Sequence, residues 1–172
     1  FLQLTPIIVS IIYNEDNIVA FAYSFLITLA FGSFLYLVNF EKKYEGIRIK
    51  EGFLLTVLLW LFFTIFATLP LIFGSKSDLS IVSAYFEATS GLTTTGATIF
   101  SDLSGEYYSI LFYRGLLQWI GGLGIIVLAI ALMPLLGVGG MQLYRGETQG
   151  PINQSKLRPK IAETAMVLVY IY

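Results

Sequence analysis

The sequence predicts an all-α membrane protein, built from transmembrane helices, one re-entrant short helix and an extended loop at membrane depth. Of its 172 residues, 56% are hydrophobic and 12% are charged, whereas soluble domains carry about 25% charged residues. Three long apolar stretches reach the roughly 20 residues that a helix needs to cross a bilayer. A shorter apolar segment, followed by a run of threonine and glycine, predicts the re-entrant part.

The residue types exclude several classes of protein. The formal net charge is −1, with Lys+Arg 10 against Asp+Glu 11, so no basic surface for a nucleic-acid partner is expected. The chain has no Cys and no His, which excludes disulfides, zinc sites built on those side chains, and Ser-His-Asp or Cys-His catalysis. Because the long apolar stretches also lack a carboxylate base, we expect no enzyme activity and no covalently bound cofactor.

Residues 1–40 predict an N-terminal pair of transmembrane helices. Leu4 to Tyr13 is apolar but only about half a span long, so it is either a truncated helix or an interfacial segment. We favour truncation, because the chain starts without Met and stops inside a new apolar run. After the polar turn Asn14 to Asn17, residues 18–40 form an uncharged block about 34 Å long as a helix, which is long enough to cross a membrane.

Two further spans are expected at 52–73 and 109–136. Residues 41–51, which read EKKYEGIRIKE, predict a charged loop before the first of them. Pro70 lies near the end of that span, where the following loop can absorb the lost hydrogen bond. The polar and basic segment 139–163 predicts a linker, and residues 164–172 predict the truncated start of a further repeat.

Lysine and arginine predict the orientation, because short cytoplasmic loops collect them. Eight of the ten fall in the segments 41–51 and 139–163, and the other two are Lys76 and Arg114. We therefore expect a multi-pass protein with both segments in the cytoplasm, and with Asn14 to Asn17 and residues 74–108 on the external side. Lipid headgroups are the expected partners of these basic residues, in preference to a specific ligand.

The segment 75–101, SKSDLSIVSAYFEATSGLTTTGATIFS, predicts the re-entrant element. Asp78 is a suitable N-cap for a helix over 79–90, which at about 18 Å is too short to cross a hydrocarbon core of about 30 Å. Gly91 follows where a left-handed, helix-terminating residue is favoured. The β-branched run that follows is poorly suited to helix, so residues 91–97 predict an extended strand.

This arrangement fits a dehydrated cation. Carbonyl oxygens along an extended Thr-Thr-Gly strand can replace a hydration shell, and the C-terminal end of the short helix adds partial negative charge. Both features favour K+ or Na+ over anions. The alternative is an ordinary external loop in which threonine and glycine form turns.

Three sequence stretches resemble the TrkH/KtrB superfamily of K+ transporters, and its TrkH branch in particular. They are GLTTTGAT after the short helix, the long segment from FYRGLLQWIGGLG to LYRGETQGP, and LRPKIAETA. The resemblance extends over most of the chain from about Arg48, with the N-terminal helix pair typical of that branch. It implies that residues 52–138 form a K+-channel-like repeat of helix, pore loop and helix, and that four such repeats surround one pore.

The resemblance also implies residue roles. Gly96 takes the position of the filter glycine, and Thr93, Thr94 and Thr95 form the adjoining filter strand, with backbone carbonyls as ligands. K+, the transported ion, is then expected at Thr94 and Thr95. Since one chain of this length supplies one of four filter loops, potassium uptake needs the others. The alternative function is a non-conducting membrane scaffold or sensor subunit.

The resemblance further implies an assembly in the bacterial inner membrane. It implies a homodimer that associates with a cytosolic TrkA-type ring of nucleotide-binding regulatory subunits. Any nucleotide would then bind only to that partner.

Two opposite charges remain near the short helix. Glu87 lies within it and Arg114 lies near the external start of the third span, where an unpaired charge in hydrocarbon would cost several kcal/mol. One interpretation is that they pair and support the filter from behind. The other is that each faces an external aqueous vestibule.

Overall fold

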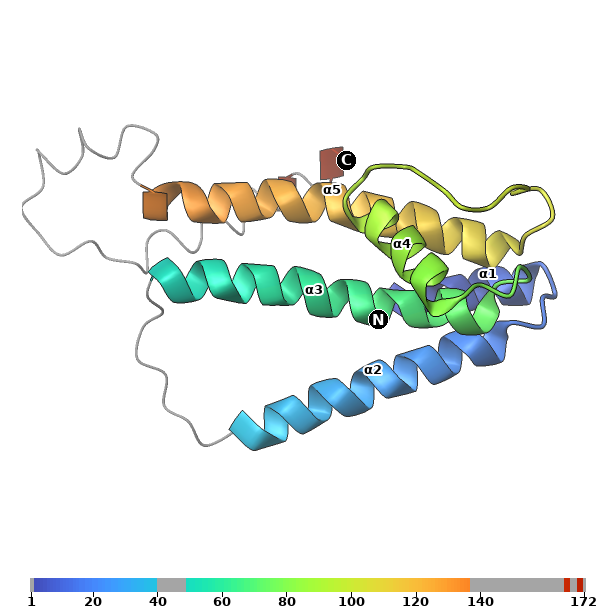
Figure 1. Ribbon diagram of the computed structural model, residues 1–172. Coiled ribbons are helices and arrows are strands. Elements are labelled where there is room, and N and C mark those ends of the chain that lie inside the picture. The colour runs from blue at the N-terminus through green and yellow to red at the C-terminus, as the bar shows by residue number, and fades with distance from the viewer. Residues whose placement is uncertain (1, 40–48, 137–165, 168–169, 172) are drawn as a thin grey trace, which may run out of the picture. The chain divides into compact units, whose positions relative to one another are not determined.

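The computed structural model describes residues 2–39, 49–136, 166–167 and 170–171, and within these residues it has helices and no strand. The helices are η1 (Leu2–Leu4), α1 (Thr5–Ile12), α2 (Ile18–Asn39), α3 (Ile49–Gly74), α4 (Ile81–Leu92) and α5 (Tyr108–Leu136) (Figure 1). The chain divides into two compact units, residues 1–118 and 119–172. The contacts described below belong to the first unit, and in the second unit α5 continues to Leu136.

Among the described residues, three helices are long and apolar enough to cross a membrane, over 18–38, 53–74 and 108–126. They coincide with the stretches predicted as spans. One boundary differs, because α3 begins at Ile49, inside the segment 41–51 that was expected to be a loop. Lys50 and Glu51 are good helix formers and extend the helix beyond its apolar part. Residues 40–48 and 139–163 lie outside the described residues.

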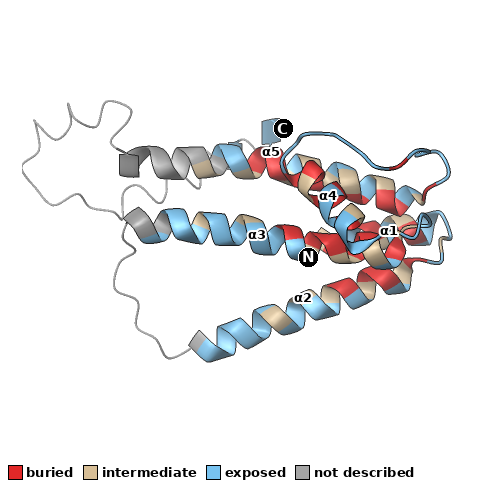
Figure 2. Ribbon diagram, in the orientation of Figure 1, coloured by how far each residue is buried: buried red, intermediate tan, exposed pale blue. Residues whose placement is uncertain are grey.

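Buried residues gather around α4, which packs against α3 (Figure 2). Ala84 and Ala88 lie one turn apart on α4 and are both fully buried, and such small side chains allow helices to approach closely. Phe21 of α2, Leu71 of α3 and Tyr113 of α5 complete the centre of this core. The rings of Phe21 and Tyr113 meet edge to face at 5.7 Å between centroids. The N-terminal pair and the segment 52–118 therefore share one core.

Gln3 of η1 supplies a hydrogen bond that α3 lacks at Pro70. Pro70 lies inside α3 and has no N–H to donate to the carbonyl of Phe66, four residues earlier. Gln3 Nε2 donates to that carbonyl oxygen at 2.9 Å. Gln3 is 7% exposed, and its Oε1 accepts from the hydroxyl of Thr28 at 3.3 Å. The sequence predicted that the following loop would compensate for Pro70. Instead, the side chain of Gln3 supplies the missing donor to Phe66, which lies 63 residues after it in the chain.

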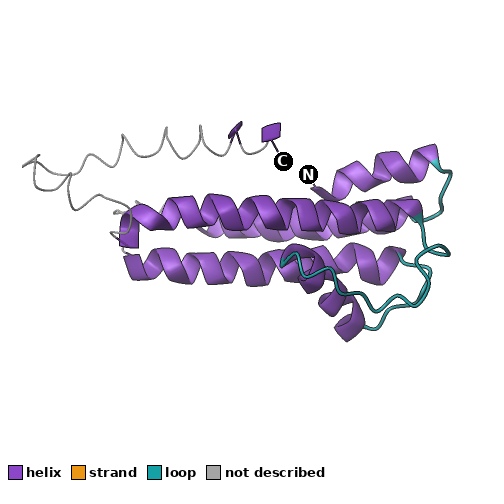
Figure 3. Cartoon of the chain, turned by 90° about the horizontal axis from the view of Figure 1, so that it is seen from above, coloured by secondary structure: helices purple, strands orange, loops and turns teal. Residues whose placement is uncertain are grey.

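The described loops gather at one end of the helices (Figure 3). Asn17, 6% exposed, is a buried polar centre there. Its Nδ2 donates to the carbonyl of Gly74 at 3.2 Å and to the hydroxyl of Ser109 at 2.8 Å, and its Oδ1 accepts from Ser10 at 2.8 Å. Asn17 therefore joins the ends of α1, α2, α3 and α5, which places the turn 13–17 and the segment 74–108 on one side.

Glu15 caps the start of α5. Its carboxylate accepts from the backbone N–H of Tyr108 at 2.6 Å and of Ser109 at 3.2 Å. The first N–H groups of a helix have no partner within it, and a negative charge there is favourable. The rings of Tyr13 and Tyr108 stack beside this cap at 4.4 Å. The loop between α1 and α2 is thereby fixed to α5.

Glu106 joins the loops on either side of α4. It is 4% exposed and accepts from the N–H of Lys76 at 2.8 Å, the N–H of Tyr107 at 3.1 Å, and the hydroxyls of Ser75 and Ser77 at 2.8 and 3.0 Å. Burial by itself raises the pKa of this carboxyl, but the four hydrogen bonds outweigh it and hold the pKa below its ordinary value. Glu106 therefore stays ionised at neutral pH.

Candidate functional site

The short helix α4 begins at Ile81, and its N-cap is Ser80. The hydroxyl of Ser80 accepts from the backbone N–H of Ser83 at 3.1 Å, and Ser80 has the extended backbone typical of an N-cap. The prediction of Asp78 as N-cap, with a helix over 79–90, was therefore wrong by two residues. Asp78 has φ +37° and belongs to the turn that leads into the helix.

The C-terminal end of α4 also differs from the prediction. Gly91 lies inside the helix, which ends at Leu92, and the left-handed residue is Thr94, with φ +56°. The N–H of Thr94 donates to the carbonyl of Gly91 at 2.9 Å, and the N–H of Thr95 donates to that of Ser90 at 3.0 Å. This is the Schellman pattern. The expected extended strand over 91–97 was therefore wrong at its start, because Gly91 and Leu92 are helical and the residues after them form a cap and an irregular segment.

Gly91 is needed for packing and not for a turn. A Cβ placed on it would lie 3.0 Å from the Cβ of Leu117 on α5, which is closer than carbon atoms normally approach. Gly91 and Leu117 are both buried. The glycine therefore lets the end of α4 lie against α5.

Residues 93–99 are exposed and leave α4 as an irregular segment. Gly96 has φ +76°. In the part of the chain that the structure describes, the carbonyl oxygens of Thr94, Thr95 and Gly96 accept no hydrogen bond, whereas the carbonyls on either side do. Thr93 O accepts from the hydroxyl of Thr94 at 2.7 Å, and Ala97 O accepts from that of Ser90 at 2.6 Å. Three consecutive carbonyls are thus available to a ligand.

Ser90 holds the middle of this segment, at Thr95, Gly96 and Ala97. Its carbonyl accepts from the N–H of Thr95 at 3.0 Å and of Gly96 at 3.5 Å, while its hydroxyl donates to Ala97. Ser90 is 5% exposed. Ser90 was not predicted as a site residue, and its position beside Gly91 near the end of the short helix was the one signal that the sequence offered for it.

Glu87 and Arg114 form an ion pair, which confirms that these two opposite charges meet. Nε and Nη2 of Arg114 both lie 2.5 Å from Glu87 Oε1. Glu87 is 2% exposed, and its other oxygen accepts from the hydroxyl of Thr98 at 3.2 Å and the N–H of Ile99 at 3.1 Å. The guanidinium of Arg114 lies over the ring of Phe100 at 5.4 Å. One carboxylate therefore connects α4, α5 and the segment that follows Gly96.

The arrangement offers neutral oxygen ligands. Within the described ranges no three side chains of Asp, Glu, His or Cys come together as a metal site. Thr94 and Thr95, the expected K+ positions, carry two of the three available carbonyls, and these follow directly on a helix C-terminus with its partial negative charge. Rings of such backbone carbonyl oxygens can replace the hydration shell of a monovalent cation.

These features define a helical membrane protein with a helix, pore-loop, helix repeat. They are the helices of membrane-spanning length, the short capped helix between two of them, and the carbonyl-bearing segment that follows the short helix. The family model described as TrkH, cation transport protein, matches residues 17–172. The chain belongs to this family, whose members are transporters and not enzymes. The resemblance seen in the sequence is confirmed.

Three relatives illustrate the match. The Trk system potassium uptake protein TrkH of Escherichia coli K12 is 49% identical over 170 residues, and TrkG of the same organism is 39% identical, each covering 99% of this chain and 35% of the relative. The crystal structure of the potassium transporter TrkH from Vibrio parahaemolyticus matches with a TM-score of 0.79 and 39% identity, over 99% of this chain and 33% of that one. This chain thus spans about a third of the length of its relatives.

Proposed function

We propose that this chain supplies one of four filter loops to a potassium uptake pore. The observation that carries the proposal is the set of three carbonyls at Thr94, Thr95 and Gly96, which are exposed beyond the capped end of α4 and accept no hydrogen bond from the described residues. The names of the relatives, which describe potassium uptake, support K+ as the ion. The remaining filter loops would come from the rest of a protein about three times as long.

The proposed mechanism is replacement of the hydration shell of K+ by carbonyl oxygens. Thr93, Thr94, Thr95 and Gly96 would form this chain's part of the filter, with K+ bound at the carbonyls of Thr94 and Thr95. The partial negative charge at the end of α4 favours a cation entering that position and opposes an anion. The threonine side chains would then act on the backbone and not on the ion, as the hydroxyl of Thr94 does when it donates to the carbonyl of Thr93 at 2.7 Å.

Glu87 and Arg114 would act as filter support. The carboxylate of Glu87 holds the N–H of Ile99, three residues beyond Gly96, while Arg114 fixes the carboxylate from α5. Neither side chain would touch the ion. Their role is to keep the segment after Gly96 in place, so that its carbonyls stay aligned.

The wider assembly is also part of the proposal. The protein would lie in the bacterial inner membrane as a homodimer, with the segments 41–51 and 139–163 in the cytoplasm, on the side where a TrkA-type nucleotide-binding ring would associate. The basic residues of both segments support this orientation. Nucleotide would act only through that ring.

Gly96→Ser in the full-length protein tests the filter. A Cβ at Gly96 would have room, because its nearest neighbour would be Gln118 Nε2 at 3.7 Å. The strain would come from the backbone instead, because φ is +76° and residues with a Cβ rarely adopt that angle. We expect the backbone to rotate and K+ over Na+ preference to fall about tenfold, equivalent to about 1.4 kcal/mol. Rb+ uptake under increasing Na+ competition measures this preference.

Thr94→Ser is the matched control. It keeps the carbonyl and the hydroxyl, so we expect a much smaller change in Na+ competition. If Gly96→Ser left uptake and Na+ competition unchanged in correctly folded protein, the assignment of Thr93 to Gly96 as a filter would be wrong. A non-conducting scaffold or sensor subunit would then be the better interpretation.

A further inference from the structure

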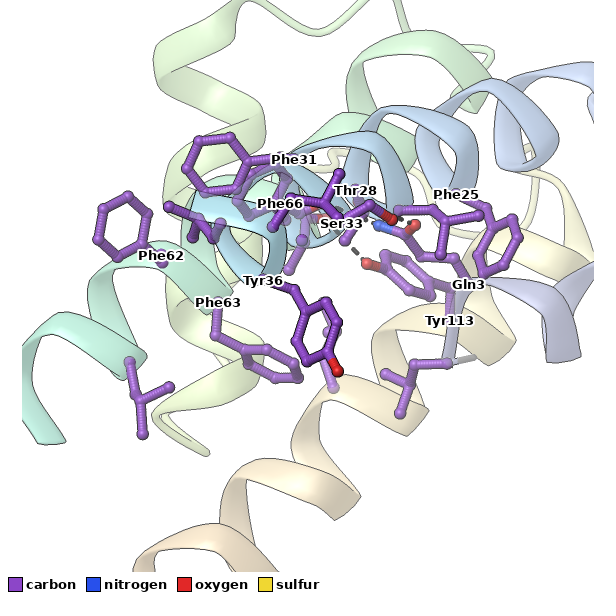
Figure 4. Close-up of a pocket in the computed structure, with 18 residues that line it drawn as sticks. Gln3, Phe25, Thr28, Phe31, Ser33, Tyr36, Phe62, Phe63, Phe66 and Tyr113 are labelled. Carbon is purple, nitrogen blue, oxygen red and sulfur yellow. Dashed lines mark hydrogen bonds between the residues drawn. The ribbon is translucent and has the colours of Figure 1, made fainter. Parts of the chain in front are cut away.

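A cleft of about 990 Å³ lies between α2 and α3 and reaches Tyr113 and Leu117 of α5 (Figure 4). Its volume is at the upper end of the range for small-molecule sites, about 300–1,000 Å³. Most of its lining is aliphatic or aromatic. The cleft is separate from α4 and from the proposed filter segment, none of whose residues lines it.

The polar side chains on one side of the cleft, Gln3, Thr28 and Tyr113, are already paired, while Ser33 and Tyr36 are exposed. Gln3 and Tyr113 lie together on one side of it in Figure 4, with Thr28 beside them. Gln3 bonds to the carbonyl of Phe66 and accepts from Thr28, and the hydroxyl of Tyr113 donates to the carbonyl of Ala67 at 3.0 Å. An occupant therefore needs no hydrogen bonds to these groups, which favours a hydrocarbon over a polar ligand.

The length of the cleft matches one leaflet of a bilayer. Both walls belong to helices of membrane-spanning length. Along α2 the lining residues run from Phe25 to Leu37, a distance of about 18 Å at about 1.5 Å per residue. Half of a hydrocarbon core of about 30 Å is about 15 Å. The cleft is thus about as long as one phospholipid tail.

The rim of the cleft continues into the apolar outer surface of the same helices. Leu35 and Leu37 on α2 are 44% and 71% exposed, and Leu59 and Phe63 on α3 are 58% and 40% exposed. In a bilayer such side chains contact lipid tails, so a tail can enter sideways without crossing a polar barrier. Phe31 closes one side of the cleft by packing on Phe62 and Phe66 of α3, at 5.9 and 5.0 Å between centroids.

We propose that this cleft is a binding site for an acyl chain of a membrane phospholipid, in the leaflet on the side of Asn39. Under the orientation proposed above, that leaflet is the cytoplasmic one. The site goes beyond ion conduction, because it would hold the N-terminal helix pair to the pore repeat with a lipid between them. The competing occupant is the part of the full-length protein beyond this chain.

Photolabelling of the full-length protein tests the site. The protein is reconstituted in phosphatidylethanolamine and phosphatidylglycerol vesicles containing a small fraction of phosphatidylethanolamine with a diazirine on its palmitoyl chain. Part of the sample is dissolved in detergent before irradiation, to remove loosely bound lipid. We expect labels on the cleft-lining residues between 28 and 37 and between 59 and 66 to survive this step. Labels at Leu26, which is 55% exposed and lies outside the cleft, should be lost.

Gly32→Trp is the decisive variant. Gly32 lines the cleft, and a Cβ on it would meet no atom within 4 Å, so an indole there fills the space that a tail would take. We expect detergent-resistant labelling to fall at least fivefold. Ala30→Trp is the control, since Ala30 is exposed on the same helix and does not line the cleft.

Three results would overturn the proposal. Cleft labels that vanish in detergent together with those at Leu26 would indicate ordinary surrounding lipid. An unlabelled cleft in active protein would mean that the rest of the protein fills it. Equal labelling of Gly32→Trp and Ala30→Trp would place the lipid elsewhere. If Gly32→Trp does not fold, Ser33→Leu fills part of the same cleft with a smaller side chain, and the same criteria apply to it.

Discussion

At the scale of single residues, the buried carboxylate of Glu87 determines most of the local geometry. It pairs with Arg114 and holds Thr98 and Ile99. We expect Glu87→Gln or Arg114→Met alone to lower the free energy of unfolding by about 3 kcal/mol, because each leaves the other charge buried and uncompensated. Thermal unfolding of the full-length protein in detergent, together with Rb+ uptake, measures both stability and transport.

The charge-exchanged variant, Glu87→Arg with Arg114→Glu, provides the control for this pair. We expect it to recover part of the loss, since opposite charges again meet between α4 and α5. Recovery should be incomplete, because an arginine at position 87 cannot accept the hydrogen bond from the N–H of Ile99. Strictly additive effects in the double-mutant cycle would contradict the observed contact.

At this scale the important residues could be predicted from the sequence, but their backbone conformations could be predicted less well. The opposite charges of Glu87 and Arg114 could be found because unpaired charges are costly at membrane depth. The left-handed residue was assigned to Gly91 because glycine is the usual choice, but the hydrogen bonds of Ser90 place Thr94 there instead. The close contact of Gly91 with Leu117 depends on packing between distant segments, which a single sequence does not specify.

At the scale of helices, α4 depends on its N-cap. We expect Ser80→Ala to cost about 1 kcal/mol, because the N–H of Ser83 loses its acceptor. Asp78→Ala is the matched control and should change stability by less than about 0.5 kcal/mol, since Asp78 does not cap the helix. Thermal unfolding of both variants in detergent distinguishes the two caps. A larger loss for Asp78→Ala would contradict the cap in the structure.

The interruption of α3 at Pro70 predicts a coupling with Gln3. Gln3→Leu should destabilise the protein by about 1–3 kcal/mol, because the buried carbonyl of Phe66 loses its donor. In the Pro70→Ala background, the alanine N–H can bond to that carbonyl along the helix, so the same change should cost clearly less. A double-mutant cycle in thermal unfolding measures the difference. An identical cost in both backgrounds would show that Gln3 does not compensate for Pro70.

Helix positions were the most predictable feature of this chain. The lengths of α2, α3 and α5 follow from the thickness of a bilayer and from uninterrupted apolar sequence. Their ends were less predictable, as the start of α3 at Ile49 shows, because charged residues can continue a helix beyond the apolar core. The hydrogen bond by which Gln3 compensates for Pro70 could not be predicted, because it joins residues that only the tertiary fold brings together.

At the scale of the whole molecule, the orientation is open to a direct test. The chain has no cysteine of its own, so single cysteines can be introduced into a full-length protein freed of any others. We expect Ser104→Cys, in an exposed loop, to react with an impermeant thiol reagent in intact cells. Gln154→Cys should react only after permeabilisation. The reverse pattern would contradict the proposed cytoplasmic location of the basic segments.

The polar contacts of Glu15 and Asn17 also impose an order on biogenesis. Glu15 meets Tyr108, 93 residues later, and Asn17 meets Ser109, 92 residues later. A growing polypeptide emerges from the ribosome N-terminal end first, so the first hairpin must wait in the membrane with these donors and acceptors unmatched. The arrival of α5 closes the contacts, which makes its insertion the step at which the nascent helices become locked together.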